Sequence, residues 1–253
     1  MKVRPAAVAG RFYTGDAQEL AREVDGYLAA APTGPQPSGV IVPHAGHIYS
    51  GPVAGHAYAR LRAAERVVLA GPAHFVPVDG IVAPEVDAWR TPLGEVPIDQ
   101  RAISDVAVPR DDYPHAPEHS LEVQLPFLQR RLAPGWQLVP LLVGRADPVA
   151  VADVLEGFLT DRDTVVVLST DLSHYLPYTA AQARDEQTAA RIVARDWEHI
   201  DDYDACGAYP LRGLLLAADR CDLTVSLLDL RNSGDTAGPH DRVVGYGAFA
   251  VGG

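Results

Sequence analysis

The chain has 253 residues, enough for one large or two small domains, and its hydrophobic share of 47% can supply a packed core. A net charge of −12 with scattered Arg residues argues against binding to a nucleic-acid backbone. No apolar run reaches the roughly 20 residues that span a bilayer, and the N-terminus has no apolar signal region. We therefore expect a cytoplasmic protein with no nucleic-acid or membrane partner. Two cysteines, Cys206 and Cys221, are too few for a disulfide framework and fit a reducing compartment.

Helical patterns and short apolar runs alternate along the chain. The first helix is expected over 17–30, before a loop rich in Pro and Gly over 31–38. Runs rich in β-branched residues predict strands buried on both faces, because such strands lose the polar alternation. In chain order, these strands are 39–42, 66–70, 137–143 and 164–168, and the further helices are 51–63, 120–132, 148–160, 180–195 and 210–218.

Three other segments complete the predicted elements. Residues 89–98 (WRTPLGEVPI) indicate a β-hairpin that turns at Leu93-Gly94, and 223–230 and 245–251 indicate two last strands. No internal repeat or low-complexity linker divides the chain. The sequence therefore predicts one α/β domain over residues 1–253, with a central mixed β-sheet flanked by helices on both faces.

Titratable side chains follow three of the predicted strands. His44 comes after 39–42 and His74 after 66–70, while Asp171 and His174 come after 164–168. Open α/β sheets bind ligands at the carboxyl ends of their strands. We therefore expect these residues to share one edge, with His174 one helical turn beyond Asp171 and able to hydrogen-bond to it.

Two further segments add candidate residues. Glu118 and His119 precede the helix 120–132, where they either cap the helix or stand in the pocket wall. Cys206 lies just before the helix 210–218, and a helix N-terminus favours the thiolate that binds metals. Strand-end histidines also serve as acid–base or buried hydrogen-bonding groups, and free cysteines are often inert, so the residues alone leave the metal site open. His115, in a loop rich in Pro, is expected to be solvated.

Seven motifs occur in order between Arg4 and Leu211. They are RPAAVAGRFY, VPHAGHIYSGPVAGHAY, GPAHFVP, DAWRTPLGEVPID, EHSLEVQLPFLQ, STDLSHY and DACGAYPL. Together they resemble the Memo-like family, also called AmmeMemoRadiSam system protein B. The resemblance implies a fold similar to the class III extradiol ring-cleaving dioxygenases, which use non-haem Fe(II).

The resemblance also assigns roles to residues. It implies the metal ligands His44, His74 and Cys206, and an acid–base role for His174 with Asp171 near it. The dioxygenase relatives use two histidines and a carboxylate, so Cys206 departs from their pattern. A thiolate changes which metal ion the site prefers. Fe(II) is therefore the first expectation, and copper and zinc are the alternatives.

Three functions follow as hypotheses. The first is a metal-dependent oxidoreductase for a small molecule, in which His174 moves a proton. The second is a non-enzymatic module that recognises a peptide or an anion in the same pocket. The third is a zinc-assisted hydrolase with Glu118 or Asp171 as the base.

Overall fold

The computed structural model describes residues 1–252, and a mixed β-sheet forms its centre. Along this sheet the strand order is β10-β11-β2-β8-β3-β7-β4, and β9 pairs with β11 outside that path. The bounds are β2 (Gly39–Val42), β3 (Arg66–Pro72), β4 (Ile81–Val82), β7 (Gln137–Val143), β8 (Thr164–Ser169), β9 (His174–Leu176), β10 (Val225–Asn232) and β11 (Val243–Val251).

The middle of the sheet is parallel. Strand β8 lies between β2 and β3 and pairs parallel with both, and β3 pairs parallel with β7. All six residues of β8 are buried, which explains the continuous apolar run over 165–168. Strands β11, β10 and β4 pair antiparallel at the two sides, so the sheet is mixed, as the sequence predicted.

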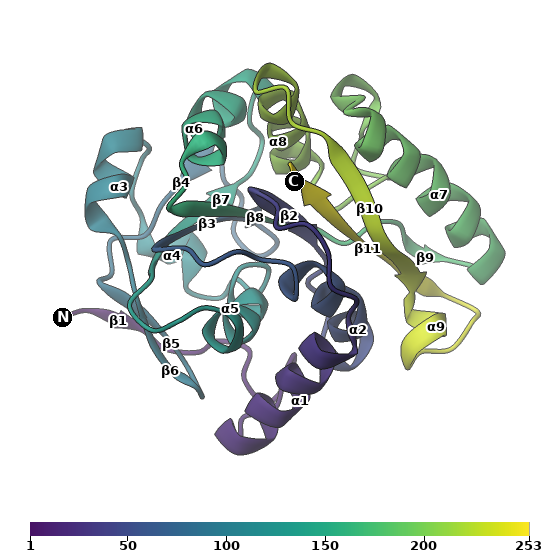
Figure 1. The fold of residues 1–253 in the computed structure, drawn as a ribbon, viewed down its shortest axis with the longest axis horizontal. Helices are drawn as coiled ribbons and strands as arrows, with labels where there is room; N and C mark the ends of the chain where they lie inside the picture. Colours follow the sequence, from purple (N-terminus) through teal and green to yellow (C-terminus); the bar gives the residue numbers. More distant parts are fainter. Residues whose placement is uncertain (253) are drawn as a thin grey trace.

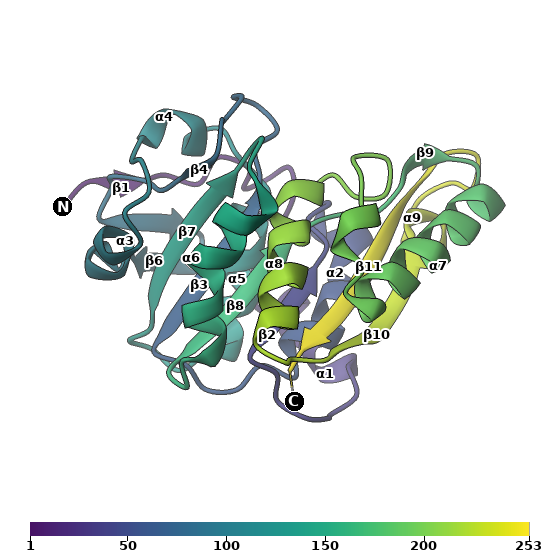
Figure 2. The ribbon, with the colours of Figure 1, turned by 90° about the horizontal axis from the view of Figure 1, so that it is seen from above.

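Helices cover both faces of the sheet (Figures 1 and 2). One face carries α2 (His47–Tyr58) and α5 (Leu125–Arg131), with α1 (Ala17–Ala30) packed outside them; the other carries α6 (Pro148–Thr160), α7 (Tyr178–Ala194) and α8 (Ala208–Arg220). The predicted α/β class with helices on both faces is confirmed. Within residues 1–252, none of the helices has the length and apolar character needed to cross a bilayer.

A smaller sheet lies beside the main one. It consists of β1 (Val3–Arg4), β5 (Ala88–Thr91) and β6 (Gly94–Pro97), in the order β1-β5-β6. The predicted hairpin is confirmed, although it turns at Pro92-Leu93, one residue before the expected position. The short elements are α3 (Gln100–Val106), α4 (Asp112–His115), η1 (Glu122–Gln124), η2 (Trp197–His199) and α9 (Ser233–Thr236).

Helix α2 differs most from its prediction, because it spans His47–Tyr58 rather than 51–63. Its N-cap is Gly46, which has no capping side chain, and Pro52 lies inside the helix, so the usual start signal is missing. Gly55 faces α1, where a Cβ would stand 2.6 Å from the carbonyl oxygen of Tyr27. The glycine therefore allows α1 to approach α2 closely.

Candidate metal centre

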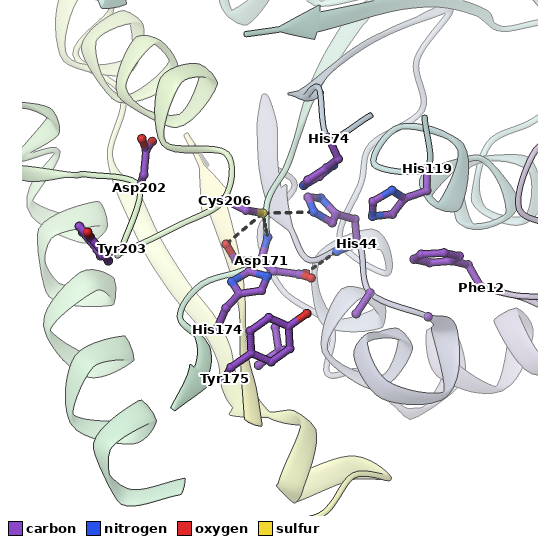
Figure 3. Close-up of a pocket in the computed structure, with 13 residues that line it drawn as sticks. Phe12, His44, His74, His119, Asp171, His174, Tyr175, Asp202, Tyr203 and Cys206 are labelled. Carbon is purple, nitrogen blue, oxygen red and sulfur yellow. Dashed lines mark hydrogen bonds between the residues drawn. The ribbon is translucent and has the colours of Figure 1, made fainter. Parts of the chain in front are cut away.

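The carboxyl ends of the three central strands meet at one pocket. His44 follows β2, His74 follows β3 and Asp171 follows β8, and the pocket at this edge has a volume of about 620 Å³ (Figure 3). Cys206 and His174 also line it. The shared edge is the one that the sequence predicted, and the chemical roles of these residues stay predictions.

His44 presents one ring nitrogen to the pocket. Its Nδ1 lies 2.9 Å from Ser169 Oγ, whose own proton is donated to the carbonyl oxygen of Ser120 at 2.6 Å. The serine oxygen therefore accepts from His44 Nδ1–H, which leaves Nε2 with its lone pair 3.2 Å from Cys206 Sγ. Burial lowers the pKa of His44 well below its usual value, and the nearby His74 adds to this. His44 thus stays neutral, as a metal ligand must be.

His74 is held by Glu118, a carboxylate with no exposed surface. Glu118 accepts from the backbone N–H of His74 at 2.6 Å and from its Nδ1 at 2.9 Å, so His74 Nε2 is free. It also accepts from the backbone N–H groups of His119 and Ser120. Burial raises the pKa of Glu118, but interactions with His119 and His74 outweigh burial and lower it overall. An ionised carboxylate that orients a histidine is typical of metal centres.

His119 lies in the pocket wall, whereas Glu118 is buried behind it. The His119 ring stands 4.7 Å from the His74 ring and 4.5 Å from Phe12, measured between centroids. Its Nδ1 is 3.2 Å from Glu118 Oε1, but without hydrogen-bond geometry. Glu118 therefore acts on the pocket through the histidines it contacts.

The thiol of Cys206 is half-buried in the pocket wall. Burial raises its pKa to about 12, and the charge of Asp171 contributes in the same direction. The helix that follows, α8, begins at Ala208, and its N-terminus does not offset this burial. Burial therefore disfavours the thiolate that the sequence led us to expect at this position. A bound metal ion deprotonates a coordinating thiol.

Asp171 connects two of the candidate ligands. Its Oδ1 accepts from the backbone N–H of His44 at 2.7 Å, and its own N–H donates to Cys206 Sγ at 3.3 Å (Figure 3). Burial raises the pKa of Asp171. Asp171 thus fixes both the backbone of one candidate ligand and the sulfur of another.

The expected Asp171–His174 hydrogen bond is not formed, because His174 begins strand β9 instead of standing on a helix. Its Nδ1 lies 2.8 Å from the carbonyl oxygen of Leu172. A carbonyl can only accept, so Nδ1 carries the proton and Nε2 is the free nitrogen of the neutral ring.

Two groups of metal-binding side chains occur in residues 1–252, both at this edge. In the first, His44, His74 and Cys206 each offer one ligand atom, and these atoms lie within 4.8 Å of one another; the second is His74, Glu118 and His119. Glu118 already accepts four hydrogen bonds, which makes the first group the better one. Two imidazoles and a thiol fit iron, copper or zinc, and three protein ligands leave a coordination position open.

Three further pocket residues were given no role in the sequence analysis, although Phe12 and Tyr175 lie within two of its motifs, RPAAVAGRFY and STDLSHY. The third is Tyr203, and Tyr175 lies beside His174 with a φ of 60°. A non-glycine residue in this left-handed region is uncommon. The Tyr175 ring is exposed and faces Arg242, whose guanidinium carbon is 5.2 Å from the ring centroid.

Two histidines outside the pocket are buried. His115, which was expected in a solvated loop, is the last residue of α4 and is 1% exposed. Its Nε2 lies 3.1 Å from the carbonyl oxygen of Val82. That expectation is wrong because the small sheet covers this segment, and Trp89 packs against the ring. His47 is likewise buried, with Nε2 2.9 Å from the carbonyl oxygen of Val123.

An α/β sheet that gathers two imidazoles and a thiol at the ends of parallel strands defines a class of candidate metal-binding proteins. The family model described as Memo-like protein matches residues 4–250, and the chain belongs to this family. It is 36% identical to a MEMO1 family protein of Methanopyrus kandleri, with 97% of this chain and 98% of the relative covered. It is 35% identical to a MEMO1 family protein of Aquifex aeolicus, with the same coverage, and 38% identical to one of Ignicoccus hospitalis, with 98% of both covered.

Proposed function

We propose that this protein holds a transition metal through His44, His74 and Cys206 and acts as an oxidoreductase on a small molecule in the adjoining pocket. One observation carries the proposal: Ser169 and Glu118 fix the Nδ1 atoms of the two histidines, which leaves both Nε2 atoms available beside the sulfur. Histidine ligands of metals are usually oriented in this way through their second nitrogen. Iron is the first candidate because of the fold resemblance, and copper and zinc are the alternatives.

The surrounding residues supply a site for a ligand. A redox metal would exchange electrons with a molecule bound at its open position. His174 Nε2 lines the pocket as a proton acceptor, because Leu172 holds the proton of Nδ1. Phe12 and Tyr175 offer aromatic surface to the same ligand. His174 is therefore the proposed acid–base group, and Asp171 orients the candidate ligands.

The hydrolase hypothesis receives less support from the same contacts. Glu118 lies behind the pocket, with its oxygens accepting from His74, His119 and Ser120. Asp171 uses Oδ1 for the backbone of His44. Glu118 is therefore poorly placed to activate a water in the way a hydrolytic base must, and Asp171 has one of its two oxygens already engaged. A module that binds a peptide or anion without metal is the other alternative.

Metal content after anaerobic purification tests the proposal. We expect one equivalent of iron or copper in the wild type, loss of most of it in Cys206→Ala, and retention in Cys221→Ala. Cys221 is the matched control, because it is a free cysteine outside the pocket. Stoichiometric zinc would favour the hydrolase. Wild-type protein that binds none of the three metals on reconstitution would leave only the metal-free binding module.

A further inference from the structure

The pocket has two halves that are held in different ways. His44 and His74 directly follow β2 and β3, so the parallel core of the sheet sets their positions. Cys206 and His174 instead lie in segments farther along the chain from β8: His174 begins β9, and Cys206 lies between η2 and α8. Both segments are hydrogen-bonded to helix α7, which lies beside β9 and β11 (Figure 2).

The first anchor is Asp185, a residue of α7 that is 2% exposed. Its Oδ1 accepts from the backbone N–H of Ser173 at 3.0 Å, between Asp171 and His174. Its other oxygen occupies the space in front of Gly245 on β11, where a Cβ would collide with it. A buried carboxylate on α7 therefore holds the backbone of the segment that carries two pocket residues.

The second anchor is Asp204, which is 3% exposed and lies two residues before Cys206. Its Oδ2 is 2.9 Å from Arg191 Nη1, and its Oδ1 is 3.3 Å from both Arg184 Nη1 and Thr188 Oγ1. These three partners all belong to α7. The same helix therefore also holds the segment that carries the sulfur.

The two anchored segments contact each other at the pocket. The backbone N–H of Cys206 donates to the carbonyl oxygen of Asp171 at 3.2 Å, and the N–H of Asp171 donates to the Cys206 sulfur. Next to them, a Cβ at residue 207 would lie 2.8 Å from Thr170 Oγ1, so Gly207 permits this close approach. A displacement of α7 would therefore move both segments together, relative to the two histidines on the sheet.

We propose that α7 is the positioning helix of the pocket, with Asp185 and Asp204 as positioning residues that set the Cys206 sulfur and His174 against His44 and His74. This inference rests on the proposed metal-binding function. Metal coordination tolerates only about 0.2 Å of error in ligand distance, so small shifts of an anchoring segment weaken binding. Neither aspartate lines the pocket, and each acts through the backbone that it holds.

Cobalt(II) alone is a suitable probe, because thiolate ligation gives it a charge-transfer absorption. We expect Asp204→Asn and Asp185→Asn each to weaken Co(II) binding by about 10- to 100-fold and to alter that absorption, as changes beside metal ligands do. Glu186→Gln is the matched control: it removes the same charge from an exposed neighbour on α7 and should bind Co(II) like the wild type. A chelator competition and a urea unfolding curve are recorded for each protein.

The outcomes separate the two proposals. Variants that lose stability in urea but keep wild-type Co(II) affinity and absorption would overturn the role of α7 and leave the metal centre intact. Wild-type protein without Co(II) affinity would overturn the metal centre itself, and the role of α7 with it. If an aspartate variant does not fold, Thr188→Val and Arg191→Gln each remove one bond to Asp204 and should give a smaller loss of the same kind. Unchanged Co(II) binding in both would again contradict the role of α7.

Discussion

Glu118 and Glu122 are two fully buried carboxylates, four residues apart, whose partners differ completely. Glu118 contacts the backbone and ring of His74, at the pocket. Glu122 pairs with Arg4 at 2.6 Å and accepts from the Tyr13 hydroxyl at 2.7 Å, away from the pocket. Glu118 therefore orients a candidate metal ligand, whereas Glu122 stabilises the fold.

This difference gives a prediction at the residue scale. Glu118→Gln should weaken zinc binding by about 10- to 100-fold, because a neutral amide holds His74 less firmly. Glu122→Gln should lower the free energy of unfolding by about 3 kcal/mol, because it leaves the buried Arg4 unpaired, with zinc affinity unchanged in the folded protein. Chelator competition and urea unfolding measure the two quantities. An equal loss of zinc affinity in both variants would contradict the assignment of Glu118 to the pocket.

The sequence located the pocket residues because strand ends and residue types are local signals. His44, His74 and Asp171 each follow an apolar run, and parallel strands bring such positions to one edge. Hydrogen-bond partners depend on tertiary contacts, so the bond of His174 to Leu172 and the raised pKa of Cys206 could not be read from the chain.

At the scale of elements, the sequence predicted the interiors of helices and strands better than their ends. The bounds of α1 and α6 agree with their predictions, since Asp16 and Asp147 cap them in the usual way. Strand β9 was missed, because its three residues pair with β11 only in the folded chain. Helix α2 was misplaced, because Gly46 offers no capping side chain at its start and Pro52 lies inside it.

The contact between α1 and α2 gives a second prediction. Gly55→Ala should lower the free energy of unfolding by about 1–3 kcal/mol, because the added Cβ meets the Tyr27 carbonyl and forces the helices apart. Gly26→Ala, in α1, is the matched control, since a Cβ there meets no atom within 4 Å. The control should be neutral or stabilising by up to about 1 kcal/mol. Equal effects of the two substitutions in urea unfolding would show that the close contact does not matter.

At the scale of the whole molecule, buried histidines make the folded state sensitive to acid. Burial lowers the pKa of both His47 and His115 to about 4, from an ordinary value of 6.5. The unfolded chain therefore binds protons that the folded protein excludes as the pH falls through this range. The contribution of these two residues to the free energy of unfolding is therefore greatest above pH 6.5, and it is lost as the pH falls from 6.5 towards 4.

A pH series tests this effect with one substitution. Between pH 7 and pH 5, His115 should cost the wild type about 2 kcal/mol of unfolding free energy by proton linkage. His115→Gln removes the titrating ring and keeps an N–H donor for the Val82 carbonyl, so its stability should fall by that much less over the same interval. Urea unfolding at both pH values gives the comparison. Parallel losses in wild type and variant would mean that His115 does not titrate in this way.

X-ray absorption at the zinc edge of the reconstituted protein tests the His44, His74 and Cys206 centre most directly. We predict one sulfur at about 2.3 Å from the metal and two imidazole nitrogens at about 2.0–2.1 Å, with oxygen or nitrogen completing the coordination. The sulfur contribution should disappear in Cys206→Ser and remain in Cys221→Ser. A wild-type spectrum with only oxygen and nitrogen ligands, or a sulfur signal that survives Cys206→Ser, would contradict the proposed centre.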